Sequence, residues 1–219
     1  MPAPFLRGKY AVCEGESMNI KRKARILIAV CCKDKAPIEL TQCLTNINRR
    51  LDIEYSFTYI KGALVNDSRN AAVKQMLEGS YTHLMFIDDD IQFPPDAINR
   101  LVDMKADIAS GIYVSKEAHP RLMAWDNLRI IEGHMIADQI ADPKAEGAEA
   151  VGMGFCLIRR KVFEDVIKEF NTVFFPLFFA GEDLTFCYLA KQCGYHVDLD
   201  TNIDLYHVGT YYFGLKDYE

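Results

Sequence analysis

Residues 25–114 alternate between short apolar runs and amphipathic stretches, and this alternation constrains the fold more than any other feature. Residues 26–32 (ILIAVCC) are continuously apolar, which is typical of a strand buried on both faces of a parallel sheet. The amphipathic stretches have helical spacing, and short connections join the segments, as in βαβ units. Such units join their strands by right-handed crossovers. The pattern therefore predicts an α/β domain with a doubly wound, mostly parallel sheet.

The same periodicity assigns each expected element. In the first half, strands are expected at residues 26–32, 54–60, 82–87 and 107–114, and helices at residues 37–50, 67–77 and 95–104. Pro37 suits the start of the first helix, and Gly79 is expected to end the second. The second half is mixed, with a strand or hairpin at 129–137, a polar loop at 138–150, a strand at 154–159, helices at 161–170 and 182–193, and one or two short strands at 196–205. We therefore expect one domain over residues 25–219, preceded by an N-terminal extension, residues 1–24.

The charge balance bears on the partners of the protein. The chain of 219 residues has 25 Lys and Arg against 31 Asp and Glu, a formal net charge of −6. This balance argues mildly against a protein whose main role is to bind nucleic-acid phosphates, which requires clustered basic residues. The one dense basic cluster is Lys21, Arg22, Lys23 and Arg25. No apolar run approaches the ~20 residues of a membrane-spanning helix, so none is predicted.

The cysteines indicate the redox compartment. The chain has seven cysteines, an odd number, and no CxxC pair: Cys13, Cys31, Cys32, Cys43, Cys156, Cys187 and Cys193. Most of them lie inside apolar runs. We interpret them as reduced thiols of the core, which predicts a reducing compartment such as the cytoplasm.

The strongest candidate for chemistry is the triplet Asp88, Asp89 and Asp90 at the end of an apolar strand. Ligands of open α/β sheets bind beyond the carboxyl ends of the strands. Three adjacent carboxylates repel one another, and hard oxygen ligands suit Mg²⁺ or Mn²⁺. In an extended segment Asp88 and Asp90 would point into one site while Asp89 points away. The alternative is a solvated acidic turn, although Asp96 already serves the dipole of the next helix.

A second acidic pair, Glu182 and Asp183, opens a helix after Gly181. Acidic residues in a first helical turn are common dipole partners. The preceding segment, VFFPLFFAG, is strongly apolar and would place these carboxylates at the edge of the core. Burial raises the pKa of a carboxylate there, which suits a general base.

Other polar residues are weaker candidates. His207 follows two short strands and would be a structural histidine or a neutral metal ligand. The segment containing Asp67, Arg69 and Asn70 lies at a helix N-terminus, which attracts anions, and Arg is a bidentate phosphate partner. The alternative is a simple helix cap beside a surface arginine. Trp125 lies in a loop-like stretch and would stack on a ligand or pack in the core.

Taken in order, these motifs resemble the GT-A glycosyltransferases, of the small family-2-like type found in bacteria and phages. The resemblance runs from about residue 25 to residue 209. It is carried by NDSRNAAV (66–73), HLMFIDDDIQFPPDAI (83–98), ADIASGIY (106–113), GMGFCLIRRKVF (152–163), GEDLTFCYLAKQCGYHVDLD (181–200) and YHVG (206–209). It implies a Rossmann-like GT-A fold, mostly parallel, with added mixed strands in the second half.

The resemblance also implies roles at the reacting centre. Asp90 would ligate Mn²⁺ or Mg²⁺ directly, Asp88 would contact the ribose or a metal-bound water, and His207 would be a further ligand. Asp183 would be the base that deprotonates an acceptor hydroxyl, with Glu182 beside it. Such a site transfers a sugar from a nucleotide-diphosphate sugar, and the Glu-Asp pair favours inversion.

Substrate contacts are implied in the same way. The donor pocket would include Asp67, Arg69, Asn70, Asp89, Gly154 and Val30, the last facing the base with the residues up to Lys33. A UDP-sugar is the favoured donor and a GDP-sugar the second choice. Trp125 and Tyr211 are the acceptor candidates, beside the predicted loop 138–150. A glycan, a lipid-linked sugar, a protein or a hydroxymethylated DNA base would fit as acceptor, in the cytoplasm of a bacterium or of a phage-infected host.

Three alternatives compete with this interpretation. A HAD-like phosphatase also places Asp-x-Asp after an apolar strand, but normally on its first strand, whereas here the motif follows the third. A nucleotidyltransferase would need a Gly-rich loop after the first strand, and CCKDKAPIE has no glycine. A non-catalytic nucleotide- or metal-binding module is the third.

Overall fold

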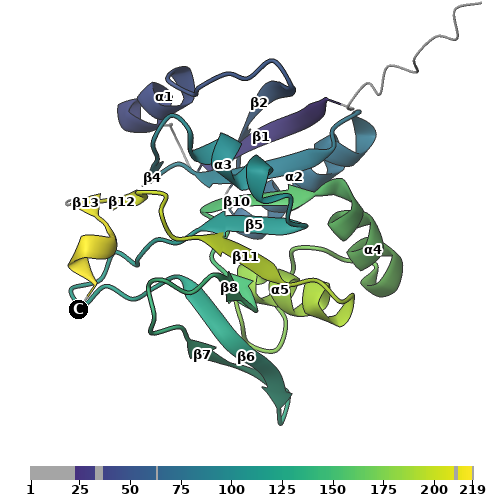
Figure 1. The fold of residues 1–219 in the computed structure, drawn as a ribbon. Helices are drawn as coiled ribbons and strands as arrows, with labels where there is room; N and C mark the ends of the chain where they lie inside the picture. The colour runs from purple at the N-terminus through teal and green to yellow at the C-terminus, as the bar shows by residue number, and fades with distance from the viewer. Residues whose placement is uncertain (1–22, 33–36, 63, 210–211, 219) are drawn as a thin grey trace, which may run out of the picture.

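The computed structural model describes residues 23–32, 37–62, 64–209 and 212–218. Its centre is a seven-stranded sheet in the order β2-β1-β3-β10-β5-β11-β8 (Figure 1). The strands are β1 (Ala24–Cys32), β2 (Ile53–Lys61), β3 (His83–Asp88), β5 (Ile108–Gly111), β8 (Gly147–Ala148), β10 (Phe155–Arg159) and β11 (Val197–Asp200). All but β8 and β10 run in one direction, so the predicted, mostly parallel sheet is confirmed.

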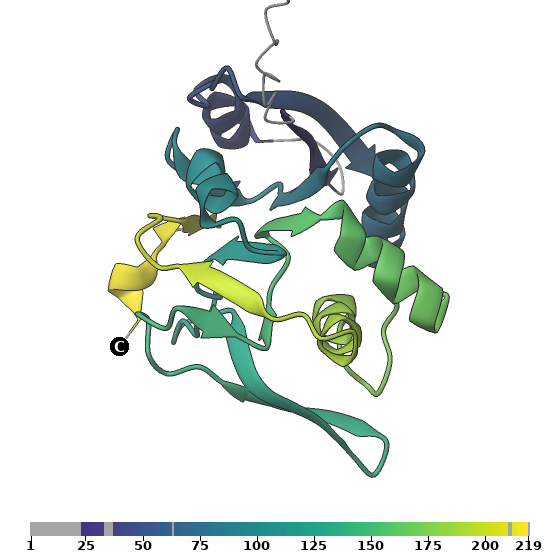
Figure 2. The same ribbon diagram turned by 45° about the vertical axis from the view of Figure 1, so that its right-hand side comes forward.

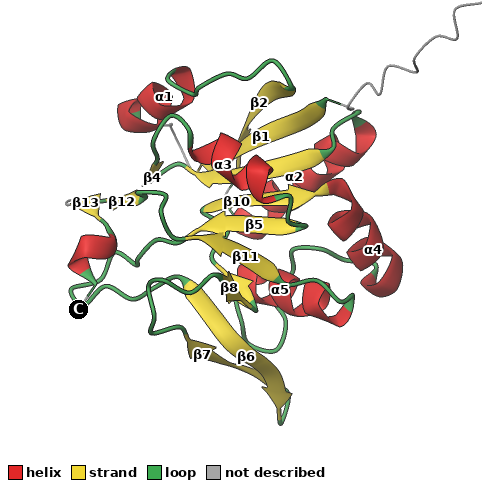
Figure 3. Ribbon diagram, viewed as in Figure 1, coloured by secondary structure: helices red, strands yellow, loops and turns green. Residues whose placement is uncertain are grey.

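Helices cover both faces of this sheet, as Figure 3 shows. They are α1 (Ile38–Thr45), α2 (Val65–Glu78), α3 (Ala97–Met104), α4 (Arg160–Phe170) and α5 (Glu182–Gln192). Helices α2, α4 and α5 pack on one side with Leu27 and Ala29, whereas α1 and α3 pack on the other with Ile28 and Val30. Alternate residues of β1 thus enter two different cores, which explains why its sequence is continuously apolar.

Strand β10 lies between β3 and β5 and is antiparallel to both. The crossover through α3 therefore skips one position of the sheet, and a strand from the second half of the chain fills it. The expected addition of mixed strands is confirmed. The apolar pattern of residues 154–159 predicts a buried strand, but it does not predict whether that strand runs parallel or antiparallel to its neighbours.

Some predicted boundaries are wrong. The first helix ends at Thr45 rather than at residue 50, because the following backbone bonds to another segment: Asn48 N–H donates to the carbonyl of Pro95 (2.8 Å). The predicted strand 107–114 ends at Gly111. The predicted loop 138–150 contains the end of one strand, all of β8 and the start of β9, which are defined by pairing with distant strands.

Two small sheets flank the central one. The first, in the order β13-β12-β4, joins β13 (Tyr212–Phe213) and β12 (Tyr206–Val208) to β4 (Ile91–Gln92), with the short helix η1 (Leu215–Asp217) after it. The second, in the order β7-β6-β9, contains the predicted hairpin, β6 (Ala124–Ile131) and β7 (His134–Gln139), together with β9 (Ala150–Val151). Figure 2 shows this hairpin projecting from the body of the domain. Its turn, Glu132 and Gly133, has positive φ angles of 49° and 78°, as primed hairpin turns require.

The six described cysteines are thiols outside any disulfide, in agreement with the prediction, and Cys13 lies outside the described residues. Within the described chain, no helix combines the length and apolar character needed to cross a membrane.

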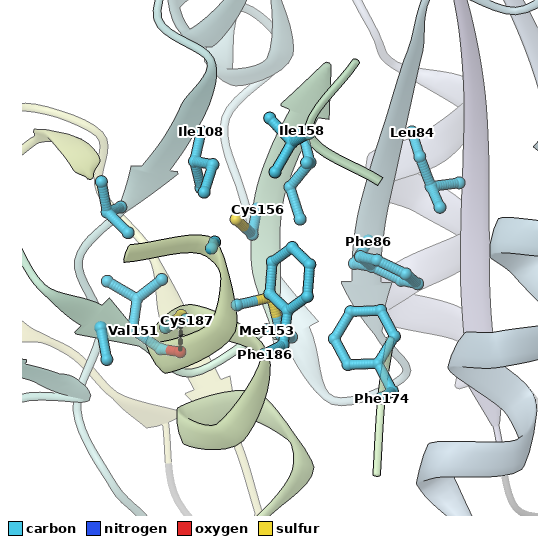
Figure 4. Close-up of a cluster of buried hydrophobic side chains, with 14 of the residues drawn as sticks. Leu84, Phe86, Ile108, Val151, Met153, Cys156, Ile158, Phe174, Phe186 and Cys187 are labelled. Atoms are coloured by element: carbon cyan, nitrogen blue, oxygen red, sulfur yellow. Dashed lines mark hydrogen bonds between the residues drawn. The ribbon is translucent and has the colours of Figure 1, made fainter. Parts of the chain in front are cut away.

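Aromatic packing under α2 and α5 fixes the segment that leads to the acidic pair (Figure 4). Phe174 is fully buried and contacts Phe86 edge-on (ring centroids 5.3 Å apart) and Phe186 in a stack (4.7 Å). The side chain of Asn70 holds both backbone groups of Phe174, donating to its carbonyl (2.7 Å) and accepting from its N–H (3.1 Å). Helix α2 therefore anchors the approach to α5.

Truncating the buried side chain of Phe174 is expected to destabilise the fold. Phe174→Ala should lower the free energy of unfolding by about 3–5 kcal/mol, because it removes a buried ring and leaves a cavity. Leu51→Ala is the control, since Leu51 is 99% exposed and its loss should change stability by less than about 0.5 kcal/mol. Urea denaturation followed by circular dichroism measures both. Equal effects would contradict the role assigned to Phe174.

Candidate functional site

A cavity of about 270 Å³ opens beyond the carboxyl ends of β1, β2 and β3, and the aspartate triplet forms one wall of it. The opposite wall comes from the ends of β1 and β2 and from the first turn of α2, and it is far less charged. The lining residues are Cys31, Cys32, Gly62, Val65, Ser68, Asp88, Asp89 and Asp90. This is the edge of the sheet at which α/β proteins bind ligands.

Asp90 lies in the turn after β3 and contacts two basic side chains, those of His207 and Lys116. His207 Nε2 lies 3.3 Å from Asp90 Oδ1, and the ammonium of Lys116 contacts Oδ2. Burial alone would raise the pKa of Asp90, but hydrogen bonds from His207 and Lys116 outweigh it and lower this pKa to about 2. Pairing of β4 with β12 brings His207 to this turn, and the N–H of Val208 bonds the carbonyl of Asp90 (2.6 Å).

Asp88, at the end of β3, lines the same cavity as Asp90 but pairs with a different basic residue. Its carboxylate accepts a hydrogen bond from Arg69 of α2 (3.2 Å), whose guanidinium lies 3.6 Å from Glu182 of α5. Burial raises the pKa of Asp88, against the opposing effect of Arg69. The side chain of Arg69 is only 5% exposed and lies over the rings of Phe86 and Phe174, 5.9 and 6.0 Å from their centroids.

Arg69 thus ties the aspartate triplet to the acidic pair. Within the described part of the chain, its Nε and Nη1 atoms are buried and have no hydrogen-bond partner. Together with its two carboxylate neighbours, this makes Arg69 a fixed internal counter-charge rather than the surface arginine that a simple helix cap would leave.

Asp183 lies in the first turn of α5, which Gly181 caps with extended backbone. Its Oδ1 accepts a hydrogen bond from the N–H of Leu184 (2.8 Å). Burial and the neighbouring charge of Glu182 raise the pKa of Asp183, and Arg69 opposes them. The raised pKa agrees with the expectation drawn from the apolar approach VFFPLFFAG.

The approach itself is strained. Phe178 and Phe179 both have positive φ angles, 54° and 59°, in the left-handed region that aromatic residues rarely adopt. Phe179 stacks on His134 of the β6–β7 hairpin (4.6 Å between ring centroids), and Met135 N–H donates to the carbonyl of Phe178 (2.9 Å). The hairpin therefore contacts the segment immediately before the acidic pair.

Gly154 shapes the back of the site. Its carbonyl accepts a hydrogen bond from the N–H of Asp88 (2.9 Å), and its N–H donates to the hydroxyl of Tyr113 (3.1 Å). A Cβ atom at this position would lie 2.7 Å from that hydroxyl and 3.2 Å from Asp88 Oδ2. Glycine is needed here for close packing behind the carboxylate.

Of the other residues expected to bind the donor, some line the cavity and others lie away from it. Asp89 lines the cavity, whereas Asp67 is exposed and accepts a hydrogen bond from Asn66 (3.1 Å). The side chain of Asn70 is engaged with Phe174, as described above. Val30 is 1% exposed inside the core, and its neighbours Cys31 and Cys32 line the cavity instead.

The two acceptor candidates remain predictions. Trp125 lies in strand β6, not in a loop, because it pairs with Gln139 and Ala150, and it packs partly buried against the core. Tyr211 lies outside the described residues.

Sequence reasoning missed Lys116 and Tyr113, whereas Cys31 and Cys32 belong to the segment that it placed beside the base. Lys116 is separated from Asp90 by 26 positions and stands in a polar segment without a motif. Only the return of the chain after β5 places it beside the aspartates, so no local sequence signal would have identified it.

The carboxylates of this cavity wall and the histidine beside them are types of side chain that bind divalent cations. Among the described residues, no group of three or more His, Cys, Asp or Glu side chains is arranged to hold one. Asp90 and His207 nevertheless form a pair of suitable donors. His207 Nδ1 donates to the carbonyl of Val114 (2.9 Å), which fixes the ring so that Nε2 faces Asp90. A histidine held in this way matches the usual outer shell of a metal ligand.

Comparisons with known proteins bear on the fold. No family model and no curated protein matches the chain. A197 from STIV is similar in structure, with a TM-score of 0.63 and 20% identity over 84% of this chain and 86% of that one. S. aureus TarS 1–349 in complex with UDP-GlcNAc gives a TM-score of 0.49 and 12% identity over 81% of this chain and 56% of that one, so this chain spans about half of it. The similarity to A197 extends over most of both chains and shows a shared fold, here the predicted α/β fold with a mostly parallel sheet flanked by helices.

Proposed function

We propose that this protein is a metal-dependent glycosyltransferase that moves a sugar from a nucleotide-diphosphate sugar to an acceptor hydroxyl. The observation that carries the proposal is the convergence of two acidic motifs from distant parts of the chain. Arg69 contacts Asp88 of the first motif and lies 3.6 Å from Glu182 of the second, at the carboxyl edge of the sheet. The cavity beside them has a weakly charged wall and an acidic wall, which suits a nucleoside joined to a metal-bound diphosphate.

Asp90 and His207 are the residues that would hold the metal, Mn²⁺ or Mg²⁺. When bound, the cation would neutralise the charge that builds on the departing diphosphate. Asp88 would contact the ribose or a metal-bound water, while Arg69 keeps its carboxylate in place. UDP-sugars are the first donors to test and GDP-sugars the second.

Asp183 would act as the base. It would accept the proton of the acceptor hydroxyl as that oxygen attacks the anomeric carbon and the bond from this carbon to the diphosphate breaks. Displacement by the acceptor from the opposite side inverts the anomeric configuration. The burial of Asp183 and the charge of Glu182 favour proton uptake by this carboxylate.

The raised pKa of Asp183 predicts a pH dependence. The base works only when ionised, so kcat/KM should fall as the pH is lowered through its pKa. Because burial raises that pKa above the ordinary 3.8, the fall should begin at a higher pH than for an exposed aspartate. Initial rates at constant ionic strength give the profile. A rate that stays flat down to pH 4 would contradict the assignment.

The proposed function is tested with a donor panel. The protein is incubated with UDP- and GDP-sugars and MnCl₂, and release of UDP or GDP is measured with and without EDTA. Metal-dependent release from at least one donor is expected. Absence of turnover with every donor, together with absence of metal-dependent nucleotide binding, would reject the proposal.

A further inference from the structure

Lys116 places a flexible cationic side chain against the aspartate triplet. Its ammonium contacts Asp90 Oδ2 and lies 3.5 Å from the carbonyl of Val208, while His207 occupies the other oxygen of Asp90. A divalent cation that ligates Asp90 therefore has to share this carboxylate with Lys116 or displace its ammonium.

The two basic residues of the wall differ in their freedom to move. The side chain of Arg69 is 5% exposed and packed over two aromatic rings, so it stays on Asp88. The side chain of Lys116 is 35% exposed and belongs to a surface turn, closed by Ser115 N–H donating to the carbonyl of Arg121 (2.8 Å). Its long, flexible stem allows the ammonium to move while the turn stays in place.

We propose that Lys116 binds the diphosphate of the donor, and that in the protein without ligand its ammonium is held in an ion pair with Asp90. Binding of a divalent cation at Asp90 weakens the attraction between this carboxylate and the ammonium. The displaced Lys116 then contacts the diphosphate oxygens, where it adds to the positive charge beside the leaving group. This inference rests on the proposed function and adds a residue to its donor site.

The proposal makes opposite predictions for two ligands. Lys116→Met removes a competitor for Asp90, so Mn²⁺ alone should bind about threefold to fivefold more tightly, the effect of losing a partly exposed ion pair. The same variant removes a charge-assisted hydrogen bond to phosphate, so UDP at saturating Mn²⁺ should bind at least about tenfold more weakly. Isothermal titration calorimetry of the full chain with MnCl₂, and then with UDP in MnCl₂, measures both.

Two further variants sharpen the test. Lys116→Arg keeps the charge and should retain most of the UDP affinity. Lys74→Met is the matched control, because Lys74 is 75% exposed on α2 and lies 3.9 Å from Glu78, and it should leave both affinities unchanged. A change in the same direction for both ligands in Lys116→Met, or none for either, would overturn the proposal.

The outcomes also separate this inference from the proposed function. If the unaltered protein binds UDP with Mn²⁺ and hydrolyses a donor but Lys116→Met lacks the opposite shifts, the inference on Lys116 alone fails. If the unaltered protein neither binds UDP nor turns over any donor, both the proposed function and the inference on Lys116 are rejected. If it binds UDP but no Mn²⁺, competition between Lys116 and a metal for Asp90 is refuted.

Discussion

Asp183→Asn is expected to leave donor binding intact and to slow sugar transfer by about 10²–10⁴-fold, the usual contribution of a general base. The substitution keeps the size of the side chain, and an amide oxygen still accepts the hydrogen bond that Leu184 N–H donates to Oδ1. What it removes is the ability to take a proton. Rates with a saturating donor and calorimetric affinities for UDP, measured on the same preparation, separate the two effects.

Asp103→Asn is the control for this experiment. Asp103 is an exposed residue of α3 that pairs with Arg50, and it should have no effect on transfer. If Asp183→Asn transfers sugar at nearly the unaltered rate, Asp183 is not the base.

Asp90→Ala is expected to abolish metal-dependent nucleotide binding, with a loss of more than about 100-fold in affinity for UDP in Mn²⁺, since even partners of metal ligands cost 10–100-fold when removed. Asp90 contacts both His207 and Lys116, so its loss also leaves these two basic side chains without this carboxylate. UDP affinity should therefore be measured with MnCl₂ and again with EDTA, and the variant should show the same value in both.

Asp96→Ala provides the comparison. Asp96 precedes α3, is exposed and makes no side-chain hydrogen bond to cap that helix, so nucleotide affinity should stay the same. An unchanged response of Asp90→Ala to Mn²⁺ would remove Asp90 from the metal site.

Local sequence was sufficient for features that depend on periodicity. The strand that leads into the aspartate triplet and the helix after Gly181 lie at residues 83–88 and 182–192, within one residue of the predicted 82–87 and 182–193. The direction of β10 was not predictable, because a buried strand has the same composition in either orientation. The loop prediction for residues 138–150 was wrong for a related reason: β8 and β9 are too short for any pattern and exist through pairing with β11 and β6.

The sequence by itself determined that an acidic triplet ends a buried strand and that a second acidic pair opens a helix, since both follow from apolar runs bounded by polar residues. Only the tertiary structure decided which charges those carboxylates meet. Arg69 reaches Asp88 and Glu182 because α2 and α5 pack on the same face of the sheet, and Lys116 reaches Asp90 because the chain turns back after β5. Contacts between residues so far apart depend on the packing of whole elements, which short-range spacing does not encode.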